Sequence, residues 1–167
     1  EINILSLQTS KDYTFGSFEQ RHIDILRHIK KVVKIPVIMK LGSNLTNPIA
    51  LINQLYANGA AAVVLFNRFY QPDINIDTQT FTSSNVMSTP NELADKIRWT
   101  AIASSQIPQL DYAVSGGVHC AKGVIKSILA GATAVQICSV IYQYGNKEIE
   151  NMKRELSVWM EENGYES

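Results

Sequence analysis

One charged side chain stands inside an otherwise apolar strand segment of this chain. Lys40 lies between Met39 and Leu41. Lysines are rarely buried without a partner, so this ammonium group pairs with a carboxylate, faces an anionic centre, or serves as a Schiff-base amine. Asn3 and Asn67 also lie in or at the end of apolar segments. A buried amide costs free energy unless it is hydrogen-bonded, so each asparagine is either a satisfied core residue or a ligand-binding group.

A second group of residues has the composition of an anion site. Gly116 and Gly117 follow a predicted strand that ends at Ser115, and a helix is expected to begin near His119. Consecutive backbone N–H groups and the helix dipole at such a turn attract an anion. A Gly–Gly pair alone is often only a tight turn. Because Ser139 follows the next strand, the two turns together predict a phosphate site.

Several other polar residues allow two interpretations each. Ser6, after the first strand segment, is a general base or an ordinary loop serine. Arg68 binds an anion or pairs with an acid in the long segment after it, and His119 donates to phosphate or caps a helix. Cys120 and Cys138 have no histidine partner near them in a catalytic spacing and are expected to be small packing residues.

An alternation of strands and helices must position these residues. Short apolar segments predict five strands, at residues 1–5, 37–41, 60–66, 111–115 and 134–138. Apolar positions at helical spacing, with cap and stop signals, predict helices over residues 17–33, 47–58, 89–104, 119–130 and 147–163. The first helix is expected to begin with a Ser17–Gln20 capping box and to carry His22 and His28 on its surface.

One long polar segment, residues 67–88, interrupts the alternation. It contains Pro72 and many Ser, Thr, Asn and Asp residues. A loop of this length without structure of its own is usually functional. The short runs at residues 74–76 and 79–81 predict a small hairpin within it.

The alternation predicts an α/β fold with parallel strands joined by right-handed crossovers. Two architectures fit: a (β/α)8 TIM barrel, of which this chain supplies about five βα units, and a five-stranded doubly wound parallel sheet. The strands repeat every roughly 33 residues, close to a barrel of about 250 residues in eight units. In both architectures ligands bind at the carboxyl ends of the strands, where the polar residues named above lie.

The composition excludes several classes of protein. Lys plus Arg and Asp plus Glu number 15 each, for a net charge of +0, so no basic excess indicates nucleic acid or an anionic membrane as partner. The longest apolar run, residues 60–66, is too short to span a bilayer. Two cysteines cannot form a disulfide framework or a four-cysteine metal site. We therefore expect reduced thiols in a cytoplasmic protein, and no bound metal.

Taken in order, these segments resemble the C-terminal half or more of the dihydroorotate dehydrogenase family, FMN-dependent (β/α)8 barrels. The resemblance covers essentially the whole chain and rests on six short motifs: Ile2–Ser6, Val37–Leu41, Val64–Asn67, Ser115–Val118, Gly131–Ile137 and Trp159–Ser167. It implies that residues 1–167 are the C-terminal part of a single FMN-binding barrel domain.

The resemblance also implies a role for particular residues. Ser6 matches the position of the catalytic base, and Lys40 matches a lysine that contacts the flavin. Asn3 matches an asparagine that contacts flavin or pyrimidine and is assigned to substrate binding, and Asn67 matches an asparagine that binds the pyrimidine substrate. The FMN phosphate is implied to be bound by the two turns, at Ser115, Gly116, Gly117, Cys138 and Ser139.

The activity implied is oxidation of dihydroorotate to orotate in pyrimidine biosynthesis, with FMN as cofactor. The base removes a proton from C5, and hydride passes from C6 to flavin N5. This chain departs from the family pattern at residues 7–8, where Pro–Asn is usual, at Arg68, at Cys138, and at residues 83–87, where a glycine-rich segment is usual. Two alternatives stay open beside it: a flavin-barrel oxidoreductase with another substrate, and a non-catalytic phosphate- or flavin-binding barrel. An aldolase with Lys40 as its Schiff-base residue is a third.

The expected partners follow from the resemblance. They are a small pyrimidine substrate and a second copy in a homodimer, with no nucleic acid and no membrane span. Five βα units leave a barrel incomplete, so we expect this chain to be part of a protein of roughly twice the length, scaling from about 250 residues per barrel plus insertions. A preceding segment would then supply the rest of the barrel.

Overall fold

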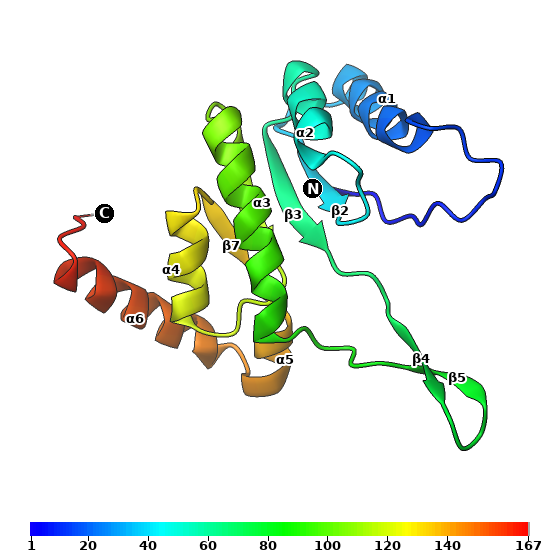
Figure 1. Ribbon diagram of the computed structural model, residues 1–167. Helices are drawn as coiled ribbons and strands as arrows, with labels where there is room; N and C mark the ends of the chain where they lie inside the picture. Colours follow the sequence, from blue (N-terminus) through cyan, green and yellow to red (C-terminus); the bar gives the residue numbers. More distant parts are fainter. Residues whose placement is uncertain (167) are drawn as a thin grey trace.

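A parallel sheet forms the centre of the computed structural model, which describes residues 1–166 (Figure 1). Its five strands are β1 (Ile2–Asn3), β2 (Ile38–Gly42), β3 (Ala62–Asn67), β6 (Asp111–Ser115) and β7 (Ala134–Gln136). The spatial order is β1-β2-β3-β6-β7, so each strand pairs with the next one along the chain. A doubly wound sheet reverses its strand order at a switch point, and this sheet has no reversal. The barrel interpretation is confirmed, and the doubly wound alternative is wrong.

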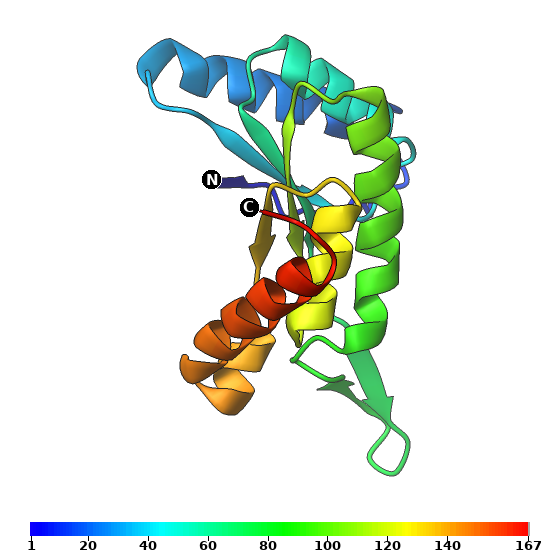
Figure 2. The ribbon, with the colours of Figure 1, turned by 90° about the vertical axis from the view of Figure 1, so that its left-hand side faces the viewer.

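The helices cover the outer side of this sheet. They are α1 (Ser17–Val32), α2 (Pro48–Ala57), α3 (Leu93–Gln106), α4 (Ala121–Leu129) and α6 (Lys147–Glu162). Consecutive helices pack against one another from α1 to α4, and α6 packs on α4. Both views show α2, α3 and α4 on the same side of the strands (Figures 1 and 2). Helices on one side of sequentially ordered strands are the arrangement of a barrel wall.

The starts of α1 and α2 are held by different side chains. At α2, Asn47 Oδ1 accepts the N–H of Ala50 at 3.0 Å, and Pro48 is the first helical residue, as the sequence predicts. The predicted capping box at α1 is wrong: Ser17 is already helical, and Gly16 is the N-cap, with φ of 81°. A side chain outside the predicted capping box accepts a hydrogen bond from the first turn of α1 instead: Tyr13 Oη accepts the N–H of Phe18 at 3.3 Å.

The core lies between the sheet and its helices. Met39, Leu41, Val63 and Leu65 are fully buried, at alternating positions along β2 and β3. Tyr112 on β6 fastens the end of α3, because its hydroxyl donates to carbonyl oxygens near that end, at 2.9 and 3.1 Å. Burial raises the pKa of Tyr112 to about 12.

Three predictions about side-chain placement are wrong. His22 is fully buried rather than on the surface, because it lies one helical turn from Phe18 and one from Leu26 on the inner face of α1. Cys120 and Cys138 are exposed free thiols rather than packing residues, because both lie in turns beyond the strand ends and not in the core.

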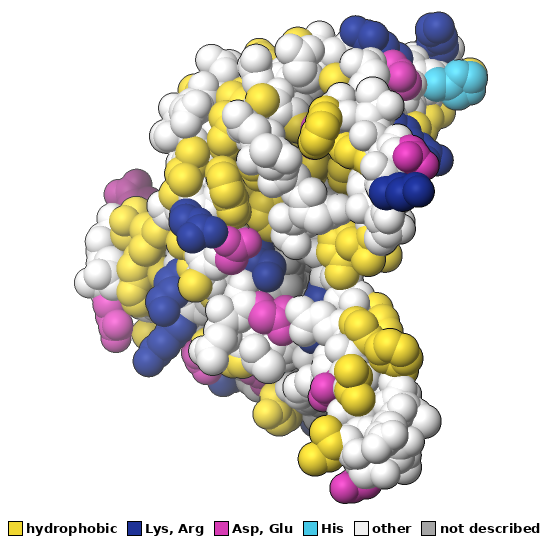
Figure 3. Space-filling model, turned by 45° about the vertical axis from the view of Figure 1, so that its right-hand side comes forward, with side chains coloured by type: hydrophobic (Ala, Val, Ile, Leu, Met, Phe, Trp, Pro, Cys, Tyr) yellow, Lys and Arg dark blue, Asp and Glu magenta, His cyan; other side chains and the backbone are white. Residues whose placement is uncertain are grey.

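The segment after β3 folds into the predicted hairpin. Its strands, β4 (Pro72–Asn75) and β5 (Thr80–Ser83), are antiparallel, with Ile74 opposite Phe81. The hairpin projects away from the body, and apolar side chains lie on its surface (Figures 1 and 3). The sequence does not predict the short helix α5 (Ser139–Tyr144), which follows β7.

Two further features bear on the predictions. No helix within residues 1–166 is long and apolar enough to cross a membrane. Ser167, the last residue of the closing motif, lies outside the described residues.

Candidate functional site

The carboxyl ends of the strands enclose a cavity of about 670 Å³. The ends of β2, β3, β6 and β7 contribute to its lining, together with residues 84–86 and Ser88. Seven of the nine predicted site residues line it: Lys40, Asn67, Ser115, Gly116, Gly117, Cys138 and Ser139. This volume lies within the range of about 300–1,000 Å³ that is usual for small-molecule and cofactor sites.

A fixed cation lies on the inner face of the sheet. Lys40 Nζ donates to Gln136 Oε1 at 2.7 Å and lies 3.4 Å from Glu1 Oε1. Gln136 in turn donates from its amide nitrogen to Glu1. Lys40 is on β2 and Gln136 on β7, and β3 and β6 lie between them. In a flat sheet three strand spacings are about 14 Å, so this contact requires the strong inward curvature of a barrel.

An asparagine pair repeats this geometry nearby. Asn67 donates from its amide nitrogen to Asn3 Oδ1 across the intervening strand β2. Side chains from alternate strands meet in this way in the interior layers of a barrel. Asn67 is buried and lines the cavity, whereas Asn3 does not line it. The structure thus brings the two predicted asparagines together but places only one at the cavity.

The glycine turn after β6 has two residues in the left-handed region. Gly116 and Gly117 have φ of 95° and 82°. A Cβ on Gly117 would lie 2.5 Å from the backbone nitrogen of Leu93, so α3 itself requires glycine at this position. Within residues 1–166, backbone hydrogen bonds outside helices and strands use no N–H of Gly116, Gly117 or Val118. All three residues line the cavity, and none of their N–H groups has an acceptor among those backbone hydrogen bonds.

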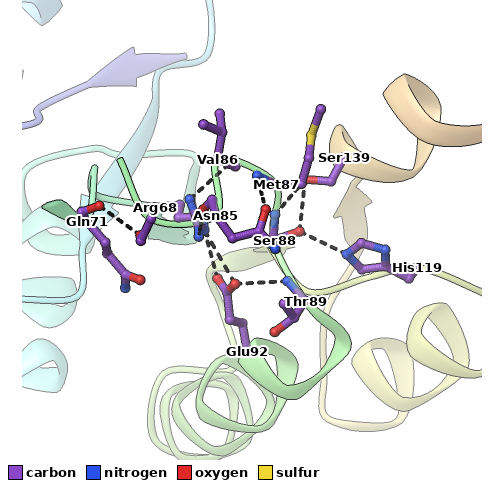
Figure 4. A network of polar contacts seen from close by, with 11 residues as sticks. Arg68, Gln71, Asn85, Val86, Met87, Ser88, Thr89, Glu92, His119 and Ser139 are labelled. Carbon is purple, nitrogen blue, oxygen red and sulfur yellow. Dashed lines mark hydrogen bonds and ion pairs between the residues drawn. The ribbon is translucent and has the colours of Figure 1, made fainter. Parts of the chain in front are cut away.

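The segment before α3 supplies a further wall of the cavity. The backbone N–H of Ser88 donates to Ser139 Oγ at 2.9 Å, and its hydroxyl donates to the same oxygen at 3.0 Å. Ser88 Oγ is also 3.0 Å from His119 Nε2 (Figure 4). The N-cap of α4 is Cys120, so His119 is not a helix cap. Sequence reasoning does not find Ser88, because only the fold brings it to Ser139.

An arginine clamp holds this segment in place. The Arg68 guanidinium donates to the carbonyl oxygens of Asn85 and Val86, at 2.7 and 3.0 Å. It also pairs with Glu92 at 3.1 Å, and Glu92 accepts the N–H of Thr89 at 2.9 Å (Figure 4). Of the two interpretations of Arg68, pairing with an acid is confirmed. That acid lies in the 3-10 turn η1 (Pro90–Glu92) rather than in the long segment.

Ser6 stands apart from the cavity. Its hydroxyl accepts a hydrogen bond from Gln8 at 3.1 Å, its carbonyl accepts one from Asn44 at 3.2 Å, and it does not line the cavity. Its role as a base stays a prediction. Within residues 1–166, no group of three or more His, Cys, Asp or Glu side chains is placed to hold a metal ion.

The fold and the cavity together define a barrel-type α/β protein whose site lies at the carboxyl ends of its strands. The chain belongs to the dihydroorotate dehydrogenase family, whose sequence model matches residues 1–160. This match confirms the family resemblance; of the six motifs, all but the closing Trp159–Ser167 lie wholly within it.

The relatives it matches are of two named kinds. It is 33% identical over 146 residues to the dihydroorotate dehydrogenase B (NAD(+)) catalytic subunit of Thermoplasma volcanium, covering 86% of this chain and 48% of that protein. It is 28% identical over 152 residues to the subunit of the same name from Methanocaldococcus jannaschii, covering 87% and 48%. Dihydroorotate dehydrogenase A (fumarate) of Lactobacillus helveticus is 28% identical over 122 residues, covering 72% and 40%. The chain spans about half the length of the curated relatives it matches.

Proposed function

We propose that this chain forms the FMN- and substrate-binding part of an oxidoreductase that converts dihydroorotate to orotate. The observation that carries the proposal is the placement of a fixed cation, Lys40, in the same cavity as the glycine–serine turns. A cation at one part of a cavity and free backbone donors at another suit a ligand with a polarisable ring and a phosphate. Family membership supports the same reaction.

The residues present fit FMN. Free N–H groups at Gly116 and Gly117 and the hydroxyl of Ser139 suit its phosphate, with Ser115 and Cys138 beside them. Lys40 would contact the flavin ring. When bound, FMN would be the two-electron acceptor for the hydride from C6 of the substrate.

The chain's own side chains would perform the remaining steps. The Lys40 ammonium, fixed by Gln136 and Glu1, is arranged to stabilise negative charge that develops on the flavin ring. Asn67 offers its amide at the cavity for the ureide edge of a pyrimidine. Asn3, which does not line the cavity, accepts from Asn67, and its own contact with the substrate stays a prediction. Ser6 Oγ would take the C5 proton. From the resemblance, we also propose that residues 1–167 belong to one barrel domain, and that the protein is a cytoplasmic homodimer.

A second candidate is a flavin oxidoreductase of this family with another substrate. It is favoured by the position of Ser6, whose hydroxyl is engaged by Gln8 and which lies outside the cavity lining. A base in this position would have to reach a proton on a substrate of a different shape from dihydroorotate. No observation in the structure favours a Schiff-base aldolase, since Lys40 is held by a carboxylate and an amide.

The test uses the full-length protein that contains this chain. We expect flavin absorbance bands in the purified protein or after titration with FMN, and anaerobic bleaching of those bands by dihydroorotate. Bands without bleaching by dihydroorotate would leave the second candidate or a non-catalytic flavin-binding protein. Bleaching by another dihydropyrimidine or by a reduced carbonyl compound would favour the second candidate, and bleaching by none of them would favour a non-catalytic protein. Absence of bands after titration would refute the proposal.

A further inference from the structure

The contacts around Ser139 form a directed chain of hydrogen-bond donors. A serine hydroxyl carries one hydrogen, and Ser88 donates its hydrogen to Ser139 Oγ at 3.0 Å. Ser88 Oγ can therefore only accept from His119 Nε2, which lies 3.0 Å away. The imidazole is the donor in this pair whether it is neutral with its proton on Nε2 or fully protonated.

The end of this chain is a free hydroxyl hydrogen at the cavity. Ser139 Oγ accepts twice, from the backbone N–H and from the hydroxyl of Ser88. Its own hydrogen is left to donate, and Ser139 lines the cavity beside Gly116 and Gly117. Linked donors polarise one another, so the Ser139 hydroxyl becomes a stronger donor than an isolated serine.

The rest of the structure holds this chain in place from both sides. Arg68 fixes residues 85 and 86, before Ser88, while Glu92 accepts the N–H of Thr89 directly after it. Glu92 also pairs with the Arg68 guanidinium. The positive charge of Arg68 is therefore balanced by this carboxylate. Ser88 is itself only 8% exposed, so its two hydrogen bonds are shielded from competing water.

We propose that His119, Ser88 and Ser139 form a donor relay that binds a phosphate monoester through the Ser139 hydroxyl. Ser139 contacts the phosphate, and Ser88 and His119 are positioning residues that act through it. That the phosphate is that of FMN rests on the proposed function, whereas the relay itself does not.

The experiment compares two flavins that differ only in the phosphate. FMN and riboflavin are titrated into the full-length apoprotein, and binding is followed by quenching of flavin fluorescence. A hydrogen bond to a charged group is worth about 1.5–3 kcal/mol, so Ser139→Ala should weaken FMN binding by about 10- to 100-fold. Ser88→Ala and His119→Leu should weaken it by about two- to fivefold. Riboflavin affinity should not change in any of the three.

Conservative variants separate the relay from a merely structural role. Ser88→Thr keeps the hydroxyl and His119→Gln keeps an N–H donor, so both should retain most of the preference for FMN over riboflavin. Ser105→Ala, on the exposed end of α3, is the matched control and should leave both affinities unchanged. Equal losses for FMN and riboflavin, or unchanged FMN binding in Ser88→Ala and His119→Leu, would overturn the relay.

Inorganic phosphate provides a probe that does not depend on flavin. It should raise the thermal midpoint of the wild-type protein and raise it less in Ser139→Ala and Ser88→Ala. If the wild type binds neither flavin but shows this response, the proposed function fails and the relay stands. If phosphate has the same effect on the wild type and both variants, the relay is refuted.

Discussion

The two sides of the cavity are built in different ways. On one side, Lys40, Gln136 and Asn67 belong to strands, and the register of the sheet fixes their positions. On the other side, Ser88 lies in a loop that is held by hydrogen bonds from a single arginine. A shift of one residue in a strand would turn its whole set of side chains to the other face, whereas a loop can move by itself.

This difference separates two kinds of residue in the site. The strand side carries the charged and amide groups that the proposed reaction would need in fixed positions. The loop side carries the contacts in which this chain departs from the family pattern, at Arg68 and in residues 83–87. Changes on the strand side should therefore affect the reaction, and changes on the loop side should affect cofactor retention and local order.

The largest effect is expected on the strand side. On the proposed function, Lys40→Met removes the cation that would face the flavin ring, and loss of one such charge-stabilising group costs about 10²- to 10³-fold in turnover. The measurement is the single-turnover rate of flavin reduction by dihydroorotate under anaerobic conditions. Lys153→Met removes an exposed lysine on α6 and should leave the rate unchanged. An unchanged rate in Lys40→Met would show that the strand side does not carry the chemistry.

The glycine turn, where the two sides meet, should show the next largest effect. Gly117→Ala combines left-handed strain of about 1–2 kcal/mol with overpacking against the backbone of Leu93, which costs about 1–3 kcal/mol. Gly116→Ala carries the strain alone, because a Cβ there meets only the Lys96 side chain at 3.6 Å. Urea unfolding should give a clearly larger loss for Gly117→Ala. Equal losses would mean that α3 does not constrain the turn.

On the loop side, Arg68→Gln should open the 84–89 segment without unfolding the protein. The ion pair with Glu92 is partly exposed, so the loss in global stability should be about 1 kcal/mol. Limited proteolysis should cut residues 84–89 much faster than in the wild type. Arg98→Gln breaks an exposed pair with Asp95 and serves as the control. Protection equal to the wild type in Arg68→Gln would show that the clamp is not what orders the loop.

The same division explains what the sequence could predict. Apolar periodicity locates the strands, and the carboxyl-end rule then places Lys40, Asn67 and the glycine turn at one cavity. The sequence contains no signal for Ser88 meeting Ser139, because the two are 51 residues apart and one lies in a loop. The short helix after β7 is missed because six residues carry too little periodicity. His22 did carry a signal, since it is four residues from both Phe18 and Leu26 on the buried stripe.

The smallest effect concerns a histidine that lies away from the cavity, in the helix layer. On α1, His22 Nδ1 donates to the Phe18 carbonyl at 2.8 Å, and within residues 1–166 its Nε2 has no hydrogen-bond partner. Burial lowers the pKa of His22, and nearby Arg21 adds to this, against smaller opposing effects from the Phe18 carbonyl and Glu19. On the loop side, His119 is only half-buried and already has a partner in Ser88.

The sign of the pH effect follows from that depressed pKa. In the unfolded chain His22 takes up a proton near its ordinary pKa of about 6.5, while in the folded protein it stays neutral to lower pH. Its contribution to stability is therefore complete above about pH 6.5 and falls as the pH drops from there toward the folded-state pKa. His22→Gln should reduce the slope of unfolding free energy against pH below about pH 6.5. An unaltered slope in His22→Gln would place the acid sensitivity of the protein outside the helix layer that covers the strands.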